Sequence, residues 1–387
     1  MAVQVAAQEP RVFDKGLPNS ITVGAERTGE YLPLLAGKRV AVVTNQTGRI
    51  GATHLVDSLL ALKVNVVKVF APEHGFRGDA DAGEHVKDGR DPRTKLPVVS
   101  LYGDNKKPKP AQLTDVDVLV FDIQDVGVRF YTYISTLHYV MEAAAEKGLP
   151  LVVLDRPDPN GFYVDGPVLD TAMRSFVGMH PVALVHGMTI GEYAGMINGE
   201  GWLKGGVKCQ LRVVTCLGYD HAMHYTLPVK PSPNLPNMSA VYLYPALGLF
   251  EGTPVSVGRG TETPFQVIGF PGCTVGSFAF TPRSMPGAKD PPYLGQACTG
   301  VSLASYGDFI TRMDPKLQLH WLIGMYQAHP DKATFFKPFF DKLAGTTTLR
   351  EQVVAGWDEE RIRASWKPGL DAFKRVRVKY LLYDDFH

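Results

Sequence analysis

Short apolar runs alternate with segments of helical spacing along the first half of the chain. Residues 38–44 and 64–70 are rich in β-branched residues and predict buried strands, while residues 52–62 have the apolar spacing of a helix. This order is a βαβ unit. The same patterns predict further strands at 97–101, 116–121, 150–154 and 210–215, and helices at 133–147 and 189–199. The alternation predicts an α/β fold with a parallel sheet that is covered on both faces.

The pattern changes at residues 229–237, VKPSPNLPN, where three prolines interrupt all periodicity. We therefore divide the chain into a tail at 1–16, a first domain at 17–228 and an α+β domain at 229–387. The second domain is expected to be mainly helical after about Ser302, with a helix at 239–250 that breaks at Pro245. Its predicted strands lie at 266–269, 278–282 and, as a closing strand, 380–383.

Composition narrows the classes of protein. The chain has 387 residues, of which 45% are hydrophobic and 20% charged, which is usual for globular proteins of two domains. A net charge of +1 does not favour binding to nucleic acid or to an anionic membrane. No apolar run reaches the roughly 18 residues of a membrane-spanning helix. The four cysteines form no CxxC motif and are expected to be buried thiols, with disulfides as the alternative.

Polar residues follow the predicted strands at the points where these strands end. In parallel sheets the carboxyl ends of the strands meet at one edge, where ligands bind. We therefore expect the polar residues after four strands to converge there. These residues are Asn45, Glu73, His74, Asp122, Gln124, Asp125, Asp155, Arg156 and Asn160.

The loop at residues 72–86, PEHGFRGDADAGEHV, concentrates titratable groups. His74, Asp79 and His85 could hold a metal ion, but HExxH is absent and the spacing matches no closed zinc site. The chain also lacks a dinucleotide-binding glycine motif, a P-loop lysine and a G-x-S-x-G elbow. We predict no metal and no cofactor.

Carboxyl chemistry is the remaining option. Glu73 follows a predicted strand and comes directly after the stiff residue Pro72, so its carboxyl could act as a general acid. The alternative roles for this carboxyl are an ion pair with Arg77 and the capping of a backbone turn. His74 or Arg77 could orient it or bind substrate. Asp122 and Asp125 are candidates for the second carboxyl that glycoside hydrolysis usually needs.

Two further segments suit a sugar with an acidic group. Arg129 and Tyr131 bring a cation and a phenol ahead of a helix. The glycine-rich segment from Phe250 to Phe265 carries Glu251, Arg259 and Glu262, and such loops bind anions through backbone N–H groups.

Six segments in this order resemble the YbbC/NamZ family: PEHGFRG, FDIQDVGVRFYTYIST, LDRPDPNG, HGMTIGE, PSPNLPN and FEGTPVSVGRGTETPFQ. The resemblance extends from about Pro33 to the C-terminus. It implies a Rossmann-like N-terminal domain, a smaller C-terminal domain and an active site in the cleft between them. It also implies an exo-acting β-N-acetylmuramidase that releases terminal N-acetylmuramic acid from peptidoglycan-derived glycans.

The resemblance places the essential acid of the family at Glu73. Substrate-binding positions are then expected at Asn45, Tyr131, Asn160, Asn234, Glu251 and Glu262, with four arginines as candidates for the lactyl carboxylate: Arg77, Arg129, Arg156 and Arg259. Family members are typically exported, so we expect a periplasmic or extracellular protein, although MAVQVAAQEP lacks a basic signal-peptide region and a cytoplasmic location is the alternative. Two rival functions are a cell-wall-binding module without turnover and a metal-dependent hydrolase that uses the His74/Asp79/His85 loop.

Overall fold

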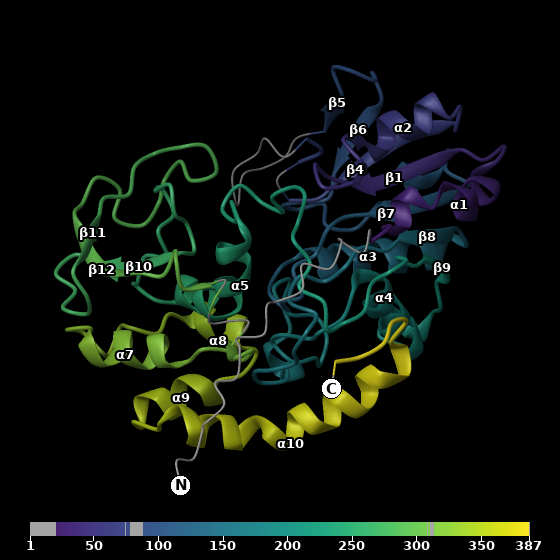
Figure 1. The fold of residues 1–387 in the computed structure, drawn as a ribbon. Coiled ribbons are helices and arrows are strands. Elements are labelled where there is room, and N and C mark those ends of the chain that lie inside the picture. Colours follow the sequence, from purple (N-terminus) through teal and green to yellow (C-terminus); the bar gives the residue numbers. More distant parts are fainter. Residues whose placement is uncertain (1–20, 74, 78–87, 308, 310–312, 387) are drawn as a thin grey trace, which may run out of the picture.

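A seven-stranded sheet forms the centre of the first half of the chain (Figure 1). The computed structural model describes residues 21–73, 75–77, 88–307, 309 and 313–386. Six strands are parallel, in the spatial order β6 (Pro97–Ser100), β4 (Val66–Ala71), β1 (Val40–Thr44), β7 (Val118–Asp122), β8 (Pro150–Leu154) and β9 (Gln210–Val214). Strand β5 (Gly89–Arg90) pairs antiparallel with β6 at one edge. Counted along the chain, the parallel strands have the order 3-2-1-4-5-6, which is the Rossmann arrangement. The predicted α/β fold is confirmed.

Both faces of this sheet are buried, as strand β1 illustrates. Val40 and Val42 belong to one apolar core, while Ala41 and Val43 belong to the other, because successive side chains of a strand point to opposite faces. Helices α1 (Thr28–Leu35) and α2 (Leu55–Ala61) cover the first face, and α3 (Tyr133–Lys147) and α4 (Ile190–Gly199) cover the second. The loop between β1 and α2 contains a small hairpin, which is formed by β2 (Arg49–Ile50) and β3 (Thr53–His54).

The ends of two helices follow from local sequence. Helix α3 ends at Gly148, which takes a left-handed φ of 69° and caps the helix through its backbone N–H. Helix α4 begins at a reciprocal capping box between Thr189 and Glu192. Because these signals depend only on neighbouring residues, the sequence located both ends correctly.

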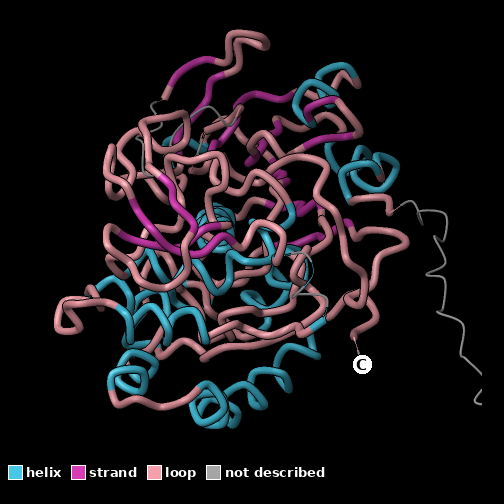
Figure 2. The backbone as a smooth tube through the Cα atoms, turned by 60° about the vertical axis from the view of Figure 1, so that its left-hand side comes forward, coloured by secondary structure: helices cyan, strands magenta, loops and turns pink. Residues whose placement is uncertain are grey.

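The second half of the chain is built around a three-stranded antiparallel sheet with helices packed against it (Figure 1). Its strands are β10 (Val267–Phe270), β12 (Cys298–Ser302) and β11 (Phe278–Phe280), in that spatial order. The helices with described bounds are α5 (Met238–Leu247), α7 (His320–Ala328), α8 (Pro338–Ala344), α9 (Thr348–Val354) and α10 (Glu359–Arg377). One apolar core extends from the α3/α4 face of the large sheet into this unit. Figure 2 shows how much of the chain between these elements is loop.

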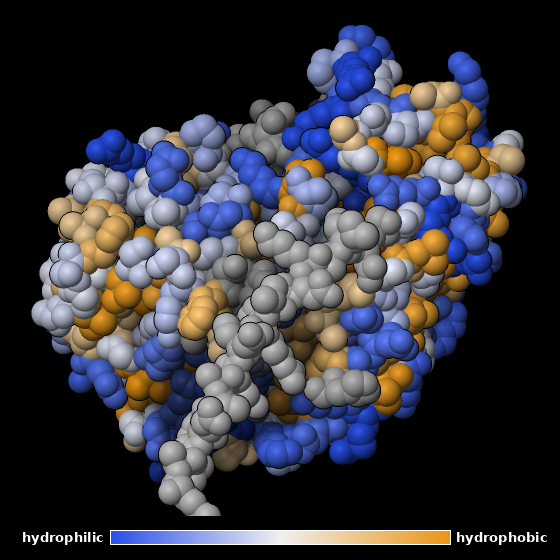
Figure 3. Space-filling view, in the orientation of Figure 1, coloured by the Kyte–Doolittle hydropathy of each residue, from blue (hydrophilic) through white to orange (hydrophobic). Residues whose placement is uncertain are grey.

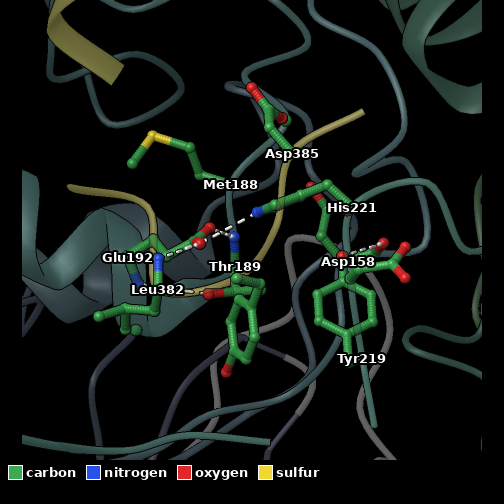
Figure 4. Close-up of polar contacts among 12 residues, drawn as sticks. Asp158, Met188, Thr189, Glu192, Tyr219, His221, Leu382 and Asp385 are labelled. Atoms are coloured by element: carbon green, nitrogen blue, oxygen red, sulfur yellow. Dashed lines mark hydrogen bonds and ion pairs between the residues drawn. The ribbon is translucent and has the colours of Figure 1, made fainter. Parts of the chain in front are cut away.

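We call the part of the chain around the large sheet the first unit, and the part around the three-stranded sheet the second unit. The C-terminal segment returns to the first unit. Helix α10 runs back along the lower edge of the molecule toward α4 (Figure 1). Beyond it, the backbone N–H of Leu382 donates to Glu192 at 2.8 Å, and the same Glu192 oxygen lies 3.0 Å from Nε2 of His221 (Figure 4). The Tyr383 hydroxyl donates to Asp155 at 2.6 Å. The end of the chain is therefore held by hydrogen bonds to helix α4 and to the residue that follows strand β8.

Three predicted details of the second half are wrong. Residues 380–383 form no strand, because Tyr380 ends a 3-10 helix and the chain is then held by the contacts just described. Ser302 ends a strand rather than starting a helix. Helix α5 also passes through Pro245 without breaking. A proline removes the hydrogen bond to the carbonyl four residues earlier, and here Asn160 Nδ2 donates to that carbonyl, of Val241, at 3.3 Å.

The described part of the chain contains no helix that is long and apolar enough to span a membrane. In Figure 3, hydrophilic and hydrophobic side chains are interspersed over the face that is shown. All four cysteines are buried free thiols, as expected.

Candidate active site

A cavity of about 370 Å³ lies beyond the carboxyl edge of the large sheet and is lined by residues from both units. The first unit contributes Glu73, Tyr102, Phe130, Tyr131, Thr132, Tyr133, Phe176 and Val177. The second part of the chain contributes Ser232, Asn234, Leu235, Tyr244, Glu251, Arg259, Phe265, Phe339 and Leu343. The structure therefore brings together five residues that the sequence predicted: Glu73, Tyr131, Asn234, Glu251 and Arg259.

Glu73 enters the cavity from the end of strand β4. The chain turns directly after it, with Gly75 N donating to Pro72 O at 3.0 Å. The Thr132 hydroxyl donates to Glu73 Oε2 at 3.0 Å. The Tyr102 hydroxyl also hydrogen-bonds Glu73, and burial, together with this carboxylate, raises the pKa of Tyr102 above its ordinary value. Two hydroxyl groups from different loops thus fix the orientation of one half-buried carboxyl.

Aromatic rings form much of the cavity wall. The Tyr131 ring packs edge-to-face on Tyr133, with centroids 4.8 Å apart, and on Tyr244 at 5.7 Å. The Tyr131 hydroxyl is held by Pro231 O at 3.0 Å. Phe339 is 44% exposed and belongs to the outer part of the lining. Rings fixed in this way offer apolar faces to a sugar, with phenol groups at their edges.

A cation faces the same cavity from the second unit. Arg259 donates through Nε to Glu251 Oε1 at 2.8 Å, and its Nη2 lies 2.7 Å from the same oxygen. The guanidinium lies over the Phe265 ring at 5.0 Å. Burial alone would lower the pKa of Arg259, but the ion pair with Glu251 outweighs it and raises this pKa, so the cation persists.

Two models of one protein family match successive parts of the chain. Residues 40–239 match the N-terminal family model of exo-β-N-acetylmuramidase NamZ, and residues 242–383 match its C-terminal model. The chain belongs to the NamZ exo-β-N-acetylmuramidase family. The resemblance found in the sequence is thereby confirmed.

Relatives of this NamZ-family chain include a Bacillus subtilis protein and two proteins with solved structures. It is 40% identical over 385 residues to the peptidoglycan β-N-acetylmuramidase NamZ of Bacillus subtilis (strain 168), covering 92% of this chain and 89% of that protein. A crystal structure of a DUF1343 family protein from Bacteroides fragilis NCTC 9343 is similar with a TM-score of 0.88 at 46% identity, covering 94% of this chain and 99% of that one. A second DUF1343 protein from the same strain gives a TM-score of 0.76 at 31% identity with the same coverage.

The carboxylates assigned as partners of Glu73 do not line the cavity. Asp122 is fully buried and forms an ion pair with Arg156, whose Nε and Nη2 donate to it at 2.5 and 2.9 Å. Burial raises the pKa of Asp122, and Arg156 opposes that shift. Asp125 is buried, and its carboxylate accepts from Gly127 N at 2.9 Å. The ion pair and the turn are structural uses of these side chains.

Two predicted amide side chains are likewise used inside the protein. Asn45 is fully buried and accepts hydrogen bonds from the backbone and hydroxyl of Thr47, so it holds the turn after β1. Asn160 donates to Val126 O at 2.8 Å and to the carbonyl freed by Pro245. Both lie at the expected edge of the sheet but outside the cavity lining.

Arg129 lies outside the cavity lining and links the two units. Its fully buried guanidinium donates to four backbone carbonyls, of which two belong to the last turn of helix α8, at Leu343 and Ala344. A cation is favourable at a helix C-terminus. Burial lowers the pKa of Arg129 to about 10, which leaves it charged at neutral pH.

Two other predicted residues lie away from the cavity lining. Arg77 forms ion pairs with Asp91 at 2.9 Å and Asp57 at 3.4 Å. Glu262 is exposed in the glycine-rich loop. His74, Asp79 and His85 lie outside the described residues. The described residues contain no cluster of three potential metal-ligating side chains.

Sequence reasoning missed several lining residues. Tyr102 directly follows the predicted strand at 97–101, so the rule that placed Glu73 at the sheet edge would also have placed it. Thr132 directly follows Tyr131, which the sequence predicted as a substrate-binding residue. Tyr244, Phe265 and Phe339 gave no local signal, because buried aromatic residues in a core and in a cavity wall have the same sequence pattern.

Proposed function

We propose that this NamZ-family glycoside hydrolase is an exo-acting enzyme that releases terminal N-acetylmuramic acid from peptidoglycan-derived glycans, with Glu73 as its general acid. The observation that carries the proposal is the position of Glu73 in a cavity whose lining also holds several aromatic rings, Glu251 and, among the described residues, Arg259 as its one cation. At about 370 Å³ the cavity lies near the lower end of ligand pockets, which span roughly 300–1,000 Å³. Such a volume suits one substituted sugar at a chain end.

The proposed step follows from the hydrogen bonds of Glu73. Thr132 donates to Oε2 and Tyr102 also hydrogen-bonds this carboxyl, and in the proposed acid form Oε1 carries the proton. Glu73 donates this proton to the glycosidic oxygen while the bond from that oxygen to C1 of the muramic acid breaks. The remaining glycan leaves as an alcohol. Water then adds a hydroxyl group at C1, and its second proton restores the acid.

The first test is hydrolysis of a chromogenic β-N-acetylmuramide, with the matching β-N-acetylglucosaminide as control and a chelator in parallel wells. We expect cleavage of the muramide alone, at a rate that the chelator does not change. Loss of activity in chelator with recovery on adding a divalent ion would favour the metal-dependent hydrolase. Binding without turnover by folded protein would favour the cell-wall-binding module.

The acid is tested by Glu73→Gln. The amide keeps the size of the side chain and can still accept from Thr132, but it cannot supply the proton. We expect normal folding and a loss of turnover of about 10²–10⁴-fold. A variant that retained near wild-type turnover would overturn this assignment of Glu73.

A further inference from the structure

We infer that Arg259 is the residue by which the cavity distinguishes N-acetylmuramic acid from N-acetylglucosamine, through an ion pair with the lactyl carboxylate. This inference rests on the proposed function. The two sugars differ by a lactyl ether, which gives muramic acid a carboxylate that glucosamine lacks. A buried site that selects this carboxylate needs a cation that is fixed and still has donors to offer.

Elimination among the charged side chains leads to Arg259. Of the described residues that line the cavity, Arg259 is the only lysine or arginine. The other three arginine candidates are engaged elsewhere, Arg77 and Arg156 in ion pairs and Arg129 with backbone carbonyls. Lys106 approaches the cavity, with its Nζ 4.6 Å from the Phe176 ring centroid, but it does not belong to the lining.

The ion pair of Arg259 leaves one edge of its guanidinium for a ligand. Nε and Nη2 both contact a single oxygen of Glu251, Oε1. Among the described residues, Nη1 donates no hydrogen bond. An arginine presents paired N–H groups to a carboxylate in a fixed plane, which a lysine cannot do. Glu251 therefore orients the guanidinium of Arg259 and leaves some of its N–H groups able to donate to a ligand.

The loop that carries Arg259 is held in an unusual backbone conformation. Gly258 and Gly260 on either side have φ of 79° and 80°, a region that favours glycine. Phe265, whose ring lies under the guanidinium, has φ of 54° although it is not glycine. Non-glycine residues in this region cluster at functional sites, where the surrounding structure maintains the strain. The loop thus fixes both the cation and the ring that supports it.

The experiment measures binding, so that it does not depend on turnover. Calorimetry would compare N-acetylmuramic acid with N-acetylglucosamine on wild-type protein and on Arg259→Gln. We expect the variant to lose about 10- to 100-fold in affinity for N-acetylmuramic acid and to keep its affinity for N-acetylglucosamine. Arg259→Lys should recover part of the loss, since it restores the charge without the planar pair of donors.

Two further variants control for folding and for general electrostatics. The double variant Glu251→Gln/Arg259→Gln removes the ion pair without leaving an unpaired charge, and it should show the same loss of preference. Lys106→Gln removes a nearby cation that is outside the lining, and it should keep the preference. An equal loss in Lys106→Gln and Arg259→Gln would overturn the inference.

Failure of the inference and failure of the proposed function give different results. If wild-type protein cleaves the muramide and Arg259→Gln binds N-acetylmuramic acid as tightly as wild type, Arg259 does not select the carboxylate and the function stands. If wild type prefers N-acetylmuramic acid but cleaves neither glycoside, and Arg259→Gln abolishes the preference, the function fails and the inference stands.

Discussion

Thr132 occupies the N-cap position of helix α3 but does not cap the helix with its side chain. Threonine is common at this position because its oxygen usually accepts from a backbone N–H of the first turn. Here the hydroxyl donates to Glu73 instead. We interpret Thr132 as a positioning residue, which acts on the reaction only through the orientation of Glu73.

This role predicts a difference between two variants of similar size. Thr132→Val removes the hydroxyl and should lower kcat by about tenfold at most, because one hydrogen bond to the neutral acid form contributes roughly 0.5–1.5 kcal/mol and Tyr102 still holds Glu73. KM should change little. Thr132→Ser keeps the hydroxyl and should recover most of kcat. Steady-state kinetics on the chromogenic muramide measure kcat and KM of both variants. Equal losses of kcat in both variants would contradict the positioning role.

Asp125 illustrates the cost of burying a carboxyl group without a cation. Burial raises its pKa to about 7, although the backbone N–H groups of Gly127 and Val126 oppose the shift. Between about pH 4 and 7 the folded protein holds a proton that the unfolded chain has lost, so the stability falls as the pH rises through this range. The penalty is absent below about pH 4 and complete above the folded pKa.

Asp125→Asn should remove this pH dependence. The amide oxygen can still accept from Gly127 N, and no charge has to be buried. We compare the free energy of unfolding of the variant with that of wild type. The difference between them should grow by about 1–3 kcal/mol in favour of the variant as the pH rises from 4 to 8. Urea unfolding of both proteins at these two pH values measures the change. Asp371→Asn, which changes a carboxylate paired with Lys367 on α10, is a control that should show no such gain.

At the scale of elements, the loop around Arg259 depends on glycine for two reasons. Gly258 has a left-handed φ, and a Cβ there would also lie 2.4 Å from Val267 Cγ2 and 2.9 Å from Thr263 O. Gly272 has a similar φ of 76°, but a Cβ there would meet nothing within 4 Å. The pair therefore separates backbone strain from crowding.

Gly272→Ala should cost only about 1–2 kcal/mol for the left-handed conformation. Gly258→Ala should cost at least about 1–3 kcal/mol more, the usual range for overpacking, because strand β10 and the loop must move. It should also weaken binding of N-acetylmuramic acid, because the loop carries Arg259. Denaturant unfolding measures the two losses of stability, and calorimetry measures the binding of N-acetylmuramic acid. Equal stability losses in both variants would show that crowding at Gly258 is relieved without displacing the loop.

Over the whole molecule, the cavity exists because two units that are distant in sequence are held together. Arg129 ties the first unit to the end of helix α8, and one apolar core runs through both units. The C-terminal segment returns to contact Glu192 of helix α4 (Figure 4). It also contacts Asp155, which directly follows strand β8. These contacts place the Glu251–Arg259 pair of the second unit in the same cavity as Glu73 of the first.

Much of the fold was accessible from sequence because it depends on local pattern. The β-branched runs located six parallel strands, and Gly148 and the Thr189–Glu192 pair located helix ends. Prediction was weaker in the second half, where strand β12 was missed and Pro245 was taken as a break. In that helix the missing hydrogen bond is replaced by Asn160, which is 81 residues away from the carbonyl it satisfies.

By itself the sequence determined the kind of sheet, the edge at which polar residues gather, and the position of Glu73 at that edge. Only the tertiary structure decided which of those polar residues remain available to a ligand. Five of these residues reach the expected edge but form hydrogen bonds or ion pairs inside the protein. Asn45 and Asp125 hold turns, Asp122 and Arg156 pair with each other, and Asn160 donates to backbone carbonyls. A residue's own sequence surroundings do not show whether its hydrogen-bonding groups will be satisfied inside the protein, because the partners come from segments that meet only after folding.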